Sequence, residues 1–408
     1  MAENVKPHDA AEVEQAIKEA IAGGTTLEIV GHGSKRVIGR AAQWDKTLDL
    51  SALSGVTLYE PAELVLSAKA GTPLAEIEAL LAANGQQLAF EPMDFGPLLG
   101  TPADSATIAG VLAGNLSGPR RVKAGAARDH FLGVTAVSGR GETFKSGGRV
   151  VKNVTGYDLC KLLAGSWGTL AAMTDVTVKT LPRAETERTL LVLGPDAVTA
   201  GKLMTAVMSS FADASAAAHV PSALVGRIAA IAAAGASVTA FRIEGVAPSV
   251  AHRSALLGDL ARSHGRLAML EEPSSRELWR AVRDATPFAA AGPSGARDIW
   301  RISTAPASGT DVGRALVERA EAEVLYDWAG GLVWAALPPS DDAASDLVRA
   351  LLAERGGHAT LIRAPAAVRA AVDVFQPEAP ALAALTKRVR EGFDPRGVLN
   401  PGRMWAGV

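Results

Sequence analysis

Residues 26–39 read TLEIVGHGSKRVIG, a short apolar strand followed by a glycine-rich loop, and this stretch decides the fold. Glycines at positions 31, 33 and 39 allow successive backbone N–H groups to turn inward and form an anion-binding nest. Ser34 and Lys35 add a hydroxyl donor and a cation. Arg36 replaces the third glycine of G-x-G-x-x-G, and Arg40 replaces the lysine of a Walker A loop, so neither standard phosphate motif is satisfied. Taken alone, the loop fits an ordinary tight turn better than an anion site.

A second segment, rich in small residues, covers residues 101–118 and reads TPADSATIAGVLAGNLSG. We expect a short helix here that buries Ile108 and Val111, with Asp104 or Ser105 as its N-cap. Small side chains let a flat ligand approach the helix backbone, and the helix N-terminus offers unpaired N–H groups and a positive dipole to an anion. Close packing of the helix on a sheet explains the same composition.

Three further motifs lie downstream: KNVTGYDL at residues 152–159, GSWGTL at 165–170 and FDPRGVLNPGRM at 393–404. The first two enclose a short amphipathic helix between polar turns, and a long strand follows them. Helix capping accounts for Asp158 and Ser166 when each is taken singly. Together with the two segments before them, these motifs favour a cofactor site over a set of unrelated turns.

The composition excludes several classes of protein. The chain has 408 residues, of which 48% are hydrophobic and 21% charged, and this suits two or three globular domains. With 41 Lys and Arg against 43 Asp and Glu, the net charge of −2 provides no basic field for nucleic acid. Cys160 is the single cysteine, so we expect no internal disulfide and no iron–sulfur cluster held by cysteines of this chain. The seven histidines lack metal-ligand spacing, so we expect no metal site. The N-terminus has no signal-peptide h-region and residues 220–241 are too interrupted to span a membrane, which predicts a cytoplasmic protein.

The order of the expected elements divides the chain into three parts. Residues 1–183 alternate helix and strand, and residues 382–408 form a last helix and the loop that follows it. Residues 187–365 carry single strands separated by helices, which indicates an α+β unit with a sheet covered on one face. The strands expected in this middle part are 189–193, 237–243, 299–303 and 332–337.

In this combination the motifs resemble the PCMH-type FAD-binding domain of flavoproteins of the vanillyl-alcohol oxidase type, and more closely the FAD-binding E subunits of bacterial glycolate oxidases. The likeness covers residues 1–183 and returns at 393–404, whereas 187–365 carry no motif of that quality. It implies an α+β protein, in which a PCMH-type domain of two α/β subdomains precedes an α+β cap with a mainly antiparallel sheet. Two positions depart from the family pattern: Ala109 stands where glycine is usual, and Trp167 where an acidic residue is usual.

The resemblance implies that FAD is bound non-covalently, with its diphosphate on the first glycine-rich loop and the small-residue helix close to the diphosphate and the flavin. Backbone nests suit two phosphates without many cations, and an apolar slot suits the flat ring. The covalent histidine of some relatives corresponds to Ser34 rather than His32, and Cys160 lies within an expected helix. The cofactor-binding residues implied are Gly31, His32, Gly33, Ser34, Lys35, Gly39, Ala106, Thr107, Gly110, Asn115, Asp129, Gly168, Thr169, Leu170 and Asn400.

The resemblance also implies a function, as a subunit of a complex that oxidises glycolate to glyoxylate and passes electrons through partner subunits. The implied partners are a sister FAD-linked subunit and an iron–sulfur subunit, which would place the protein in the cytoplasm or peripherally at the inner membrane. The histidine-rich metal motif of substrate-oxidising relatives is absent from the sequence, so no catalytic residue is assigned. Arg242, Arg301 and Arg363 can clamp a carboxylate, although structural pairing is the more ordinary role. Two alternatives stay open: a self-sufficient FAD-dependent oxidoreductase of a small hydroxy acid or sugar alcohol, and a non-catalytic scaffold subunit.

Overall fold

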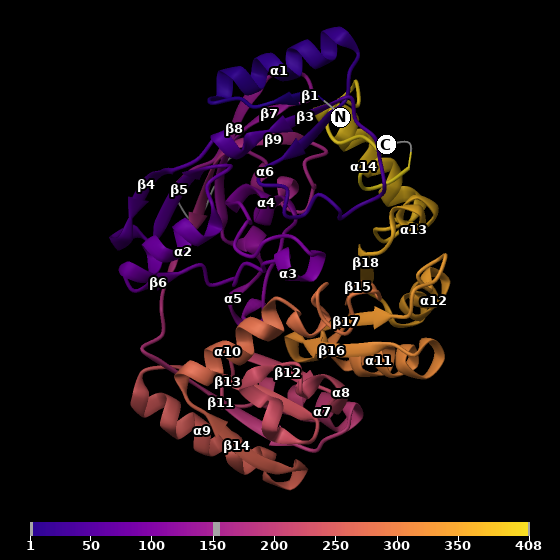
Figure 1. Ribbon diagram of the computed structural model, residues 1–408. Coiled ribbons are helices and arrows are strands. Elements are labelled where there is room, and N and C mark those ends of the chain that lie inside the picture. The colour runs from indigo at the N-terminus through magenta and orange to yellow at the C-terminus, as the bar shows by residue number, and fades with distance from the viewer. Residues whose placement is uncertain (1–2, 150–155, 407–408) are drawn as a thin grey trace.

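A computed structural model describes residues 3–149 and 156–406, so Lys152 to Thr155 of the motif at 152–159 lie outside the described residues. The chain forms two bodies, an N-terminal part that also holds both chain ends and a cap built around one large sheet (Figure 1). The chain changes from one sheet to another between residues 182 and 186. This change supports the expected domain boundary, which stays a prediction.

The first glycine-rich loop follows the last strand of a small parallel sheet, whose strands are arranged in the order β1-β3-β2. The carboxylate of Asp9 accepts the N–H of Glu12 at 2.9 Å, and Gly24 ends the first helix in the left-handed conformation. Leu399, near the C-terminus, pairs with Leu27 in a parallel bridge, so the C-terminal segment extends this sheet. The elements are β1 (Glu3–Val5), α1 (Ala10–Gly23), β2 (Leu27–Val30) and β3 (Lys46–Asp49).

The second sheet of the N-terminal part is antiparallel, with the order β4-β5-β9-β7-β8. The expected hairpin around Gly139 to Gly141 is formed by β7 and β8, and the expected long strand is β9. Its strands are β4 (Val56–Glu60), β5 (Val65–Lys69), β7 (Phe131–Ser138), β8 (Thr143–Gly147) and β9 (Ala171–Lys179), and β6 (Gln86–Gln87) pairs with β10 (Leu181–Pro182). The helices are α2 (Leu74–Ala83), α3 (Gly96–Leu99), α4 (Ile108–Ala113), α5 (Arg121–Ala124) and α6 (Leu159–Leu163).

The cap holds an eight-stranded antiparallel sheet of order β14-β11-β13-β12-β16-β17-β15-β18, which confirms the expected α+β cap. The four expected strands are β11 (Thr186–Leu193), β13 (Val238–Gly245), β15 (Asp298–Ser303) and β17 (Leu332–Leu337). Four more were not expected: β12 (Ala216–Val220), β14 (Arg266–Leu270), β16 (Glu323–Asp327) and β18 (His358–Arg363). The helices are α7 (Ala197–Met208), α8 (Ser222–Val225), α9 (Ala247–Ala261), α10 (Glu272–Arg283), α11 (Pro306–Ala320) and α12 (Ser345–Arg355).

Both faces of the cap sheet are covered, so the expectation of one covered face was wrong. Helices α7, α9, α11 and α12 pack on the outer face, where Trp300 and Phe241 are fully buried. On the inner face, Trp334 and Ile299 share a core cluster with the N-terminal part, and Phe95 packs edge-on against Trp334. The inner face therefore forms the boundary between the two bodies.

A buried network of ion pairs crosses this boundary. Glu91 of the N-terminal part accepts two hydrogen bonds from Arg242 of β13, at 2.8 and 2.9 Å. Arg120 donates to Glu91 at 2.8 Å and, through Nε, to Glu244 at 3.0 and 3.1 Å. Because each charge is paired and hydrogen-bonded away from solvent, the network holds the cap in one orientation.

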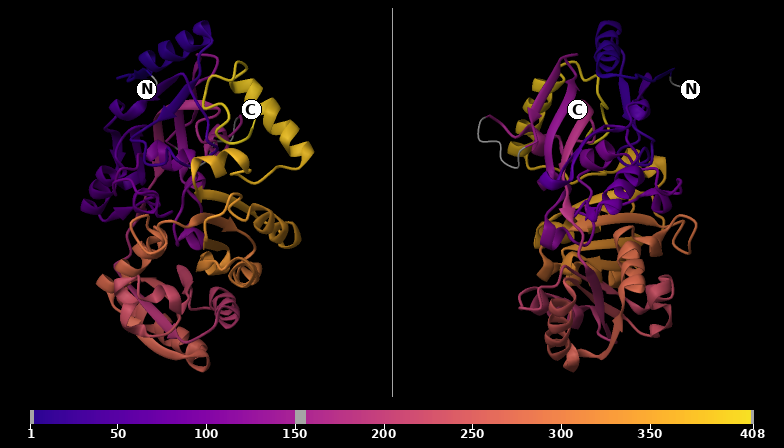
Figure 2. Two further views of the ribbon diagram at one scale, coloured as in Figure 1. Left: turned by 45° about the vertical axis from the view of Figure 1, so that its right-hand side comes forward. Right: turned by 90° about the vertical axis from the view of Figure 1, so that its left-hand side faces the viewer.

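The C-terminal segment returns from the cap to the N-terminal part (Figure 2). Helices α13 (Ala366–Ala371) and α14 (Pro380–Phe393) precede the loop that carries the last motif, and Trp44 donates from its indole to the Pro401 carbonyl at 3.1 Å. Among the helices of the described residues, none combines the length and apolar character needed to cross a membrane.

Candidate functional site

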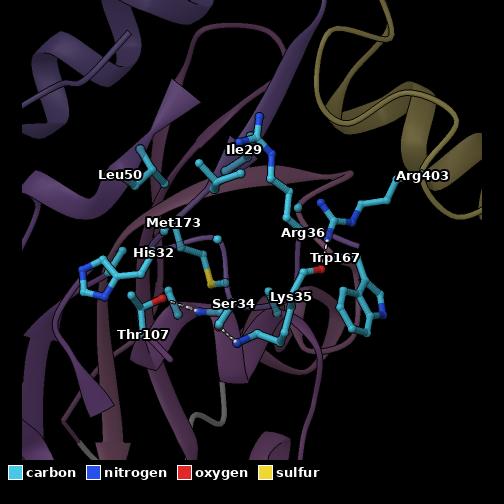
Figure 3. Close-up of a pocket in the computed structure, with 18 of the residues that line it drawn as sticks. Ile29, His32, Ser34, Lys35, Arg36, Leu50, Thr107, Trp167, Met173 and Arg403 are labelled. Atoms are coloured by element: carbon cyan, nitrogen blue, oxygen red, sulfur yellow. Dashed lines mark hydrogen bonds between the residues drawn. The ribbon is translucent and has the colours of Figure 1, made fainter. Parts of the chain in front are cut away.

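A cleft of about 700 Å³ lies where the loop after β2 faces helix α4, the turn before β9 and the C-terminal segment (Figure 3). Gly33 and Gly110 both line it, so the glycine-rich loop and the small-residue helix meet in one space. A neighbouring groove of about 1160 Å³ shares Gly31, His32 and Gly33 with the cleft and continues past the end of β3. The two hollows therefore meet at the loop.

The loop after β2 presents a row of unused backbone donors. Within residues 3–149 and 156–406, the N–H groups of residues 32–35 donate to no acceptor, and the next N–H, of Arg36, closes a turn on the Gly33 carbonyl at 3.0 Å. Gly33 has a φ of 74°, a left-handed conformation that favours glycine. A side chain at Gly31 would meet the Thr107 hydroxyl at 2.7 Å. Consecutive unpaired N–H groups are the donors of an anion nest.

The N-terminus of α4 is closed, and here the expectation from the sequence was wrong. Thr107, rather than Asp104 or Ser105, is the N-cap, and its hydroxyl accepts the N–H of Gly110 at 3.3 Å. The N–H groups of residues 108 and 109 donate to carbonyls of the turn after β5, at 3.1 and 3.2 Å. Helix α4 therefore has no free donors at its start and contributes a wall of small residues instead.

Two buried cations reach the cleft without a carboxylate partner among the described residues. Lys35 Nζ donates to the Ser34 hydroxyl at 3.1 Å. Arg403 donates from Nη2 to the Lys35 carbonyl at 3.0 Å, and its Nε is buried without an acceptor. Burial lowers the pKa of Lys35 to about 8, and the charge of Asp94 limits this fall while that of Arg403 adds to it. Burial likewise lowers the pKa of Arg403 to about 10. An anion in the cleft would stabilise both charged forms.

The C-terminal segment is fastened to two walls of the cleft by Asn400. Its Oδ1 accepts the N–H of Ile29 at 2.8 Å, and its Nδ2 donates to the Trp167 carbonyl at 2.8 Å. Gly168 has a φ of 74°, and a side chain there would meet Asn400 Nδ2 at 2.7 Å. Glycine is thus required at the point where this segment crosses the turn before β9.

The opposite side of the cleft is apolar. Ile29 and Leu50 lie there, away from Lys35, and Met173 is drawn between them and Ser34 (Figure 3). Trp167 lines the cleft on the side of Arg403, whose guanidinium lies 5.7 Å from the indole centroid. A cleft with donors at one end and apolar side chains at the other suits a ligand that joins an anionic group to an aromatic ring.

The structure brings only part of the expected site together. The expected residues that line the cleft are Gly31, His32, Gly33, Ser34, Lys35, Thr107, Gly110 and Gly168. The expected residues that do not line it are Gly39, Ala106, Asn115, Asp129, Thr169, Leu170 and Asn400. Asp129 accepts the N–H of Ala126 at 2.8 Å, and Asn115 accepts that of Arg128 at 3.1 Å, so both carboxylate and amide stabilise turns. A side chain at Gly39 would meet the backbone of the C-terminal segment, at 2.8 Å.

Sequence reasoning missed several lining residues. Arg403 lies in the last motif. It could have been found from the sequence, because it is a cation in a segment that was expected to return to the cleft. Leu50, Met173 and Ala113 carry no signal of their own, because apolar residues in strands and helices are ordinary core residues. Arg36 also lines the cleft, but Glu28 accepts from its Nε at 2.8 Å and neutralises it.

The thiol of Cys160 lies outside the cleft. It is buried, contacts the Ser146 carbonyl at 3.7 Å, and has its pKa raised to about 12, first by burial and then by Asp158. A thiol of this kind is a poor nucleophile toward a flavin. Within 3–149 and 156–406, no three His, Cys, Asp or Glu side chains are grouped so as to hold a metal ion.

The chain is similar to several known proteins. Residues 2–147 match the family model of an FAD binding domain. The chain is 31% identical over 398 residues to glycolate oxidase subunit GlcE of Escherichia coli, covering 96% of both chains. It is also 31% identical over 180 residues to a D-lactate dehydrogenase of Archaeoglobus fulgidus, covering 44% of this chain and 38% of that protein.

Two solved structures have a similar fold. That of p-cresol methylhydroxylase with substrate bound gives a TM-score of 0.73 at 12% identity, covering 98% of this chain and 88% of its own. That of 4-ethylphenol oxidase from Gulosibacter chungangensis gives 0.71 at 13% identity, covering 99% and 89%. The expected PCMH-type fold is confirmed, and the chain belongs to the family of FAD-linked oxidoreductases that includes glycolate oxidase subunit GlcE.

Proposed function

We propose that this protein is the FAD-binding subunit of a glycolate oxidase complex, which oxidises glycolate to glyoxylate. The full-length similarity to subunit GlcE supports the assignment, and a partial match of 42% identity over 88 residues links the chain to glycolate oxidase subunit GlcD of Bacillus subtilis. The partners proposed are a sister FAD-linked subunit and an iron–sulfur subunit. The complex would lie in the cytoplasm or peripherally at the inner membrane.

The observation that carries the proposal is that one cleft holds both backbone donors and cations that have no partner in the part of the chain that the structure describes. The diphosphate of FAD would accept hydrogen bonds from the N–H groups of residues 32–35 and neutralise Lys35 and Arg403. The small-residue wall of α4 would let the flavin approach the backbone at Gly110, and the apolar side would take the ring near Met173. The bound flavin supplies two-electron redox chemistry to the complex.

We propose that the expected residues which do not line the cleft hold its walls in position. Asn400 and Gly168 hold the C-terminal segment against the loop. Thr169 and Leu170 shape the turn before β9, and Gly39 packs under the same segment. The further residues proposed to support the site from behind are Ala106, Asn115 and Asp129.

The test is to express the protein alone and together with the sister and iron–sulfur subunits. We expect flavin absorbance in the protein alone and glycolate-dependent dye reduction when the subunits are combined. Gly110→Leu should expel flavin, since a Cβ there already lies 3.4 Å from Lys35 Nζ and 3.0 Å from the Thr107 hydroxyl. Leucine forms helices better than glycine, so intrinsic helix propensity does not disfavour α4 in this variant.

The matched control is Gly258→Leu in helix α9, where a Cβ meets nothing within 4 Å. Flavin retained by Gly110→Leu would contradict the placement of the cofactor. Bleaching of the isolated protein by glycolate would favour a self-sufficient oxidoreductase. Colourless protein that still assembles with both partners would favour a scaffold subunit.

A further inference from the structure

Two arginines lie over the same indole at the boundary between the N-terminal part and the cap. The guanidinium carbon of Arg121 lies 4.2 Å from the ring centroid of Trp328, and that of Arg301 lies 4.9 Å from it. Arg121 is the first residue of α5, which contacts the short 3-10 helix that begins at Trp328. Arg301 lies on β15 opposite Trp334, on the inner face of the cap sheet.

Neither guanidinium has a partner within residues 3–149 and 156–406. No hydrogen bond or ion pair from either side chain is made there, and Arg301 Nε is buried without an acceptor. Other arginines of the boundary are satisfied: Arg242 is bound by Glu91, and Arg363 donates to the carbonyls of Leu98 at 2.6 Å and Phe288 at 2.8 Å. Partly buried guanidinium groups are costly unless an anion binds them.

The pKa values of the groups around the two arginines also favour a bound anion. Burial lowers the pKa of Arg301 to about 10, and the charge of Arg121 adds to this effect. Burial raises the pKa of Asp327 to about 7, and its Oδ1 accepts the Trp328 N–H at 2.7 Å. Asp327 is therefore a weak counterion near neutral pH. Burial lowers the pKa of His358 on the neighbouring strand, and the charges of Arg301 and Arg121 lower it further.

We propose that Arg121 and Arg301 bind the carboxylate of a small organic acid, with the indole of Trp328 holding both side chains in place. A guanidinium presents a planar fork of N–H donors that matches a carboxylate, and stacking on an aromatic ring leaves those in-plane donors free. The inference deepens the proposed function, because it gives this subunit its own site for glycolate. A small acid would supply the partner that both arginines lack among residues 3–149 and 156–406.

The experiment is a calorimetric titration of sodium glycolate into the FAD-loaded full-length protein at constant ionic strength, with tryptophan fluorescence recorded in parallel. The wild-type protein should bind glycolate with a change in fluorescence. Arg301→Gln and Arg121→Gln should each weaken binding about tenfold or more, which is the loss of one charge-assisted pair of hydrogen bonds. Arg262→Gln, whose side chain is 76% exposed on the cap, is the matched control and should bind as the wild type does.

Flavin absorbance and the melting temperature are measured on every variant, so that a folding defect is seen directly. Protein that keeps its flavin but binds no glycolate overturns the carboxylate site and leaves the proposed function standing, whereas colourless protein counts against the proposed function itself. Unchanged glycolate affinity in both arginine variants also overturns the inference. Inorganic phosphate serves as a second probe, and phosphate bound more tightly than glycolate would overturn the assignment to a carboxylate.

Discussion

Replacing Lys35 by methionine should stabilise the protein without flavin and weaken its hold on flavin. Methionine keeps the length of the side chain and removes its charge. The pKa of Lys35 falls from an ordinary value of 10.5 to about 8, because the ammonium group is buried. At about 1.4 kcal/mol for each pKa unit, holding the charge at pH 7 costs the folded protein about 3 kcal/mol.

The pH dependence follows from the sign of this shift. The folded pKa lies below the unfolded one, so the cost is fully present below pH 8 and disappears as the pH rises toward 10.5. The stability difference between Lys35→Met and wild-type apoprotein should therefore be about 3 kcal/mol at pH 7 and fall toward zero near pH 10.5. A bound diphosphate favours the charged lysine, so wild-type affinity for FAD should decline as the pH rises above 8.

The assay is urea unfolding of the apoproteins between pH 7 and 10, combined with FAD titration by absorbance. Lys387→Met is the matched control, because its side chain is 68% exposed on α14 and should change neither quantity. Apoprotein of Lys35→Met that is less stable than the wild type, or that binds FAD with unchanged affinity, would refute the reasoning that Lys35 is a buried charge reserved for an anion.

Three further predictions concern the parts around the cleft. Gly31→Val should abolish flavin absorbance while circular dichroism stays unchanged, since a side chain there meets the Thr107 hydroxyl at 2.7 Å; retained flavin would contradict this. Glu91→Gln should lower the free energy of unfolding by about 3–5 kcal/mol, because it breaks a buried ion pair with Arg242, and a loss under about 1 kcal/mol in urea would show that the network is dispensable. Asn400→Ala should cost about 1–3 kcal/mol through two lost hydrogen bonds and speed proteolysis of the C-terminal segment; cleavage at the wild-type rate would argue against its fastening role.

Much of the fold follows from local sequence patterns. The cap strand at 332–337 is found with its expected limits, and the hairpin around Gly139 to Gly141 forms as expected. Strand β12 was missed because AAAHV has weak β-propensity and is buried on both faces, so no alternation marks it. The inner face of the cap sheet could not be assigned either, because its cover comes from residues distant in the sequence.

The cap of α4 illustrates the limit of local reasoning about a site. Asp104, Ser105 and Thr107 are all good N-cap residues, and the sequence offers no rule for choosing among them. The turn after β5 then supplies carbonyls to the helix start, which removes donors that the sequence left free. A helix terminus is open or closed according to what packs against it, and that is a tertiary property.

By itself, the sequence determined that a glycine-rich loop follows the apolar strand at residues 26–30, because turn residues act within a few positions. Only the tertiary structure decided which charges are paired. Arg120 and Arg121 are neighbours in the chain, yet Arg120 is bound by carboxylates and Arg121 stacks on Trp328 without one among the described residues. Pairing depends on which side chains meet across the boundary between the two bodies, and contacts between distant segments set that geometry rather than any local pattern.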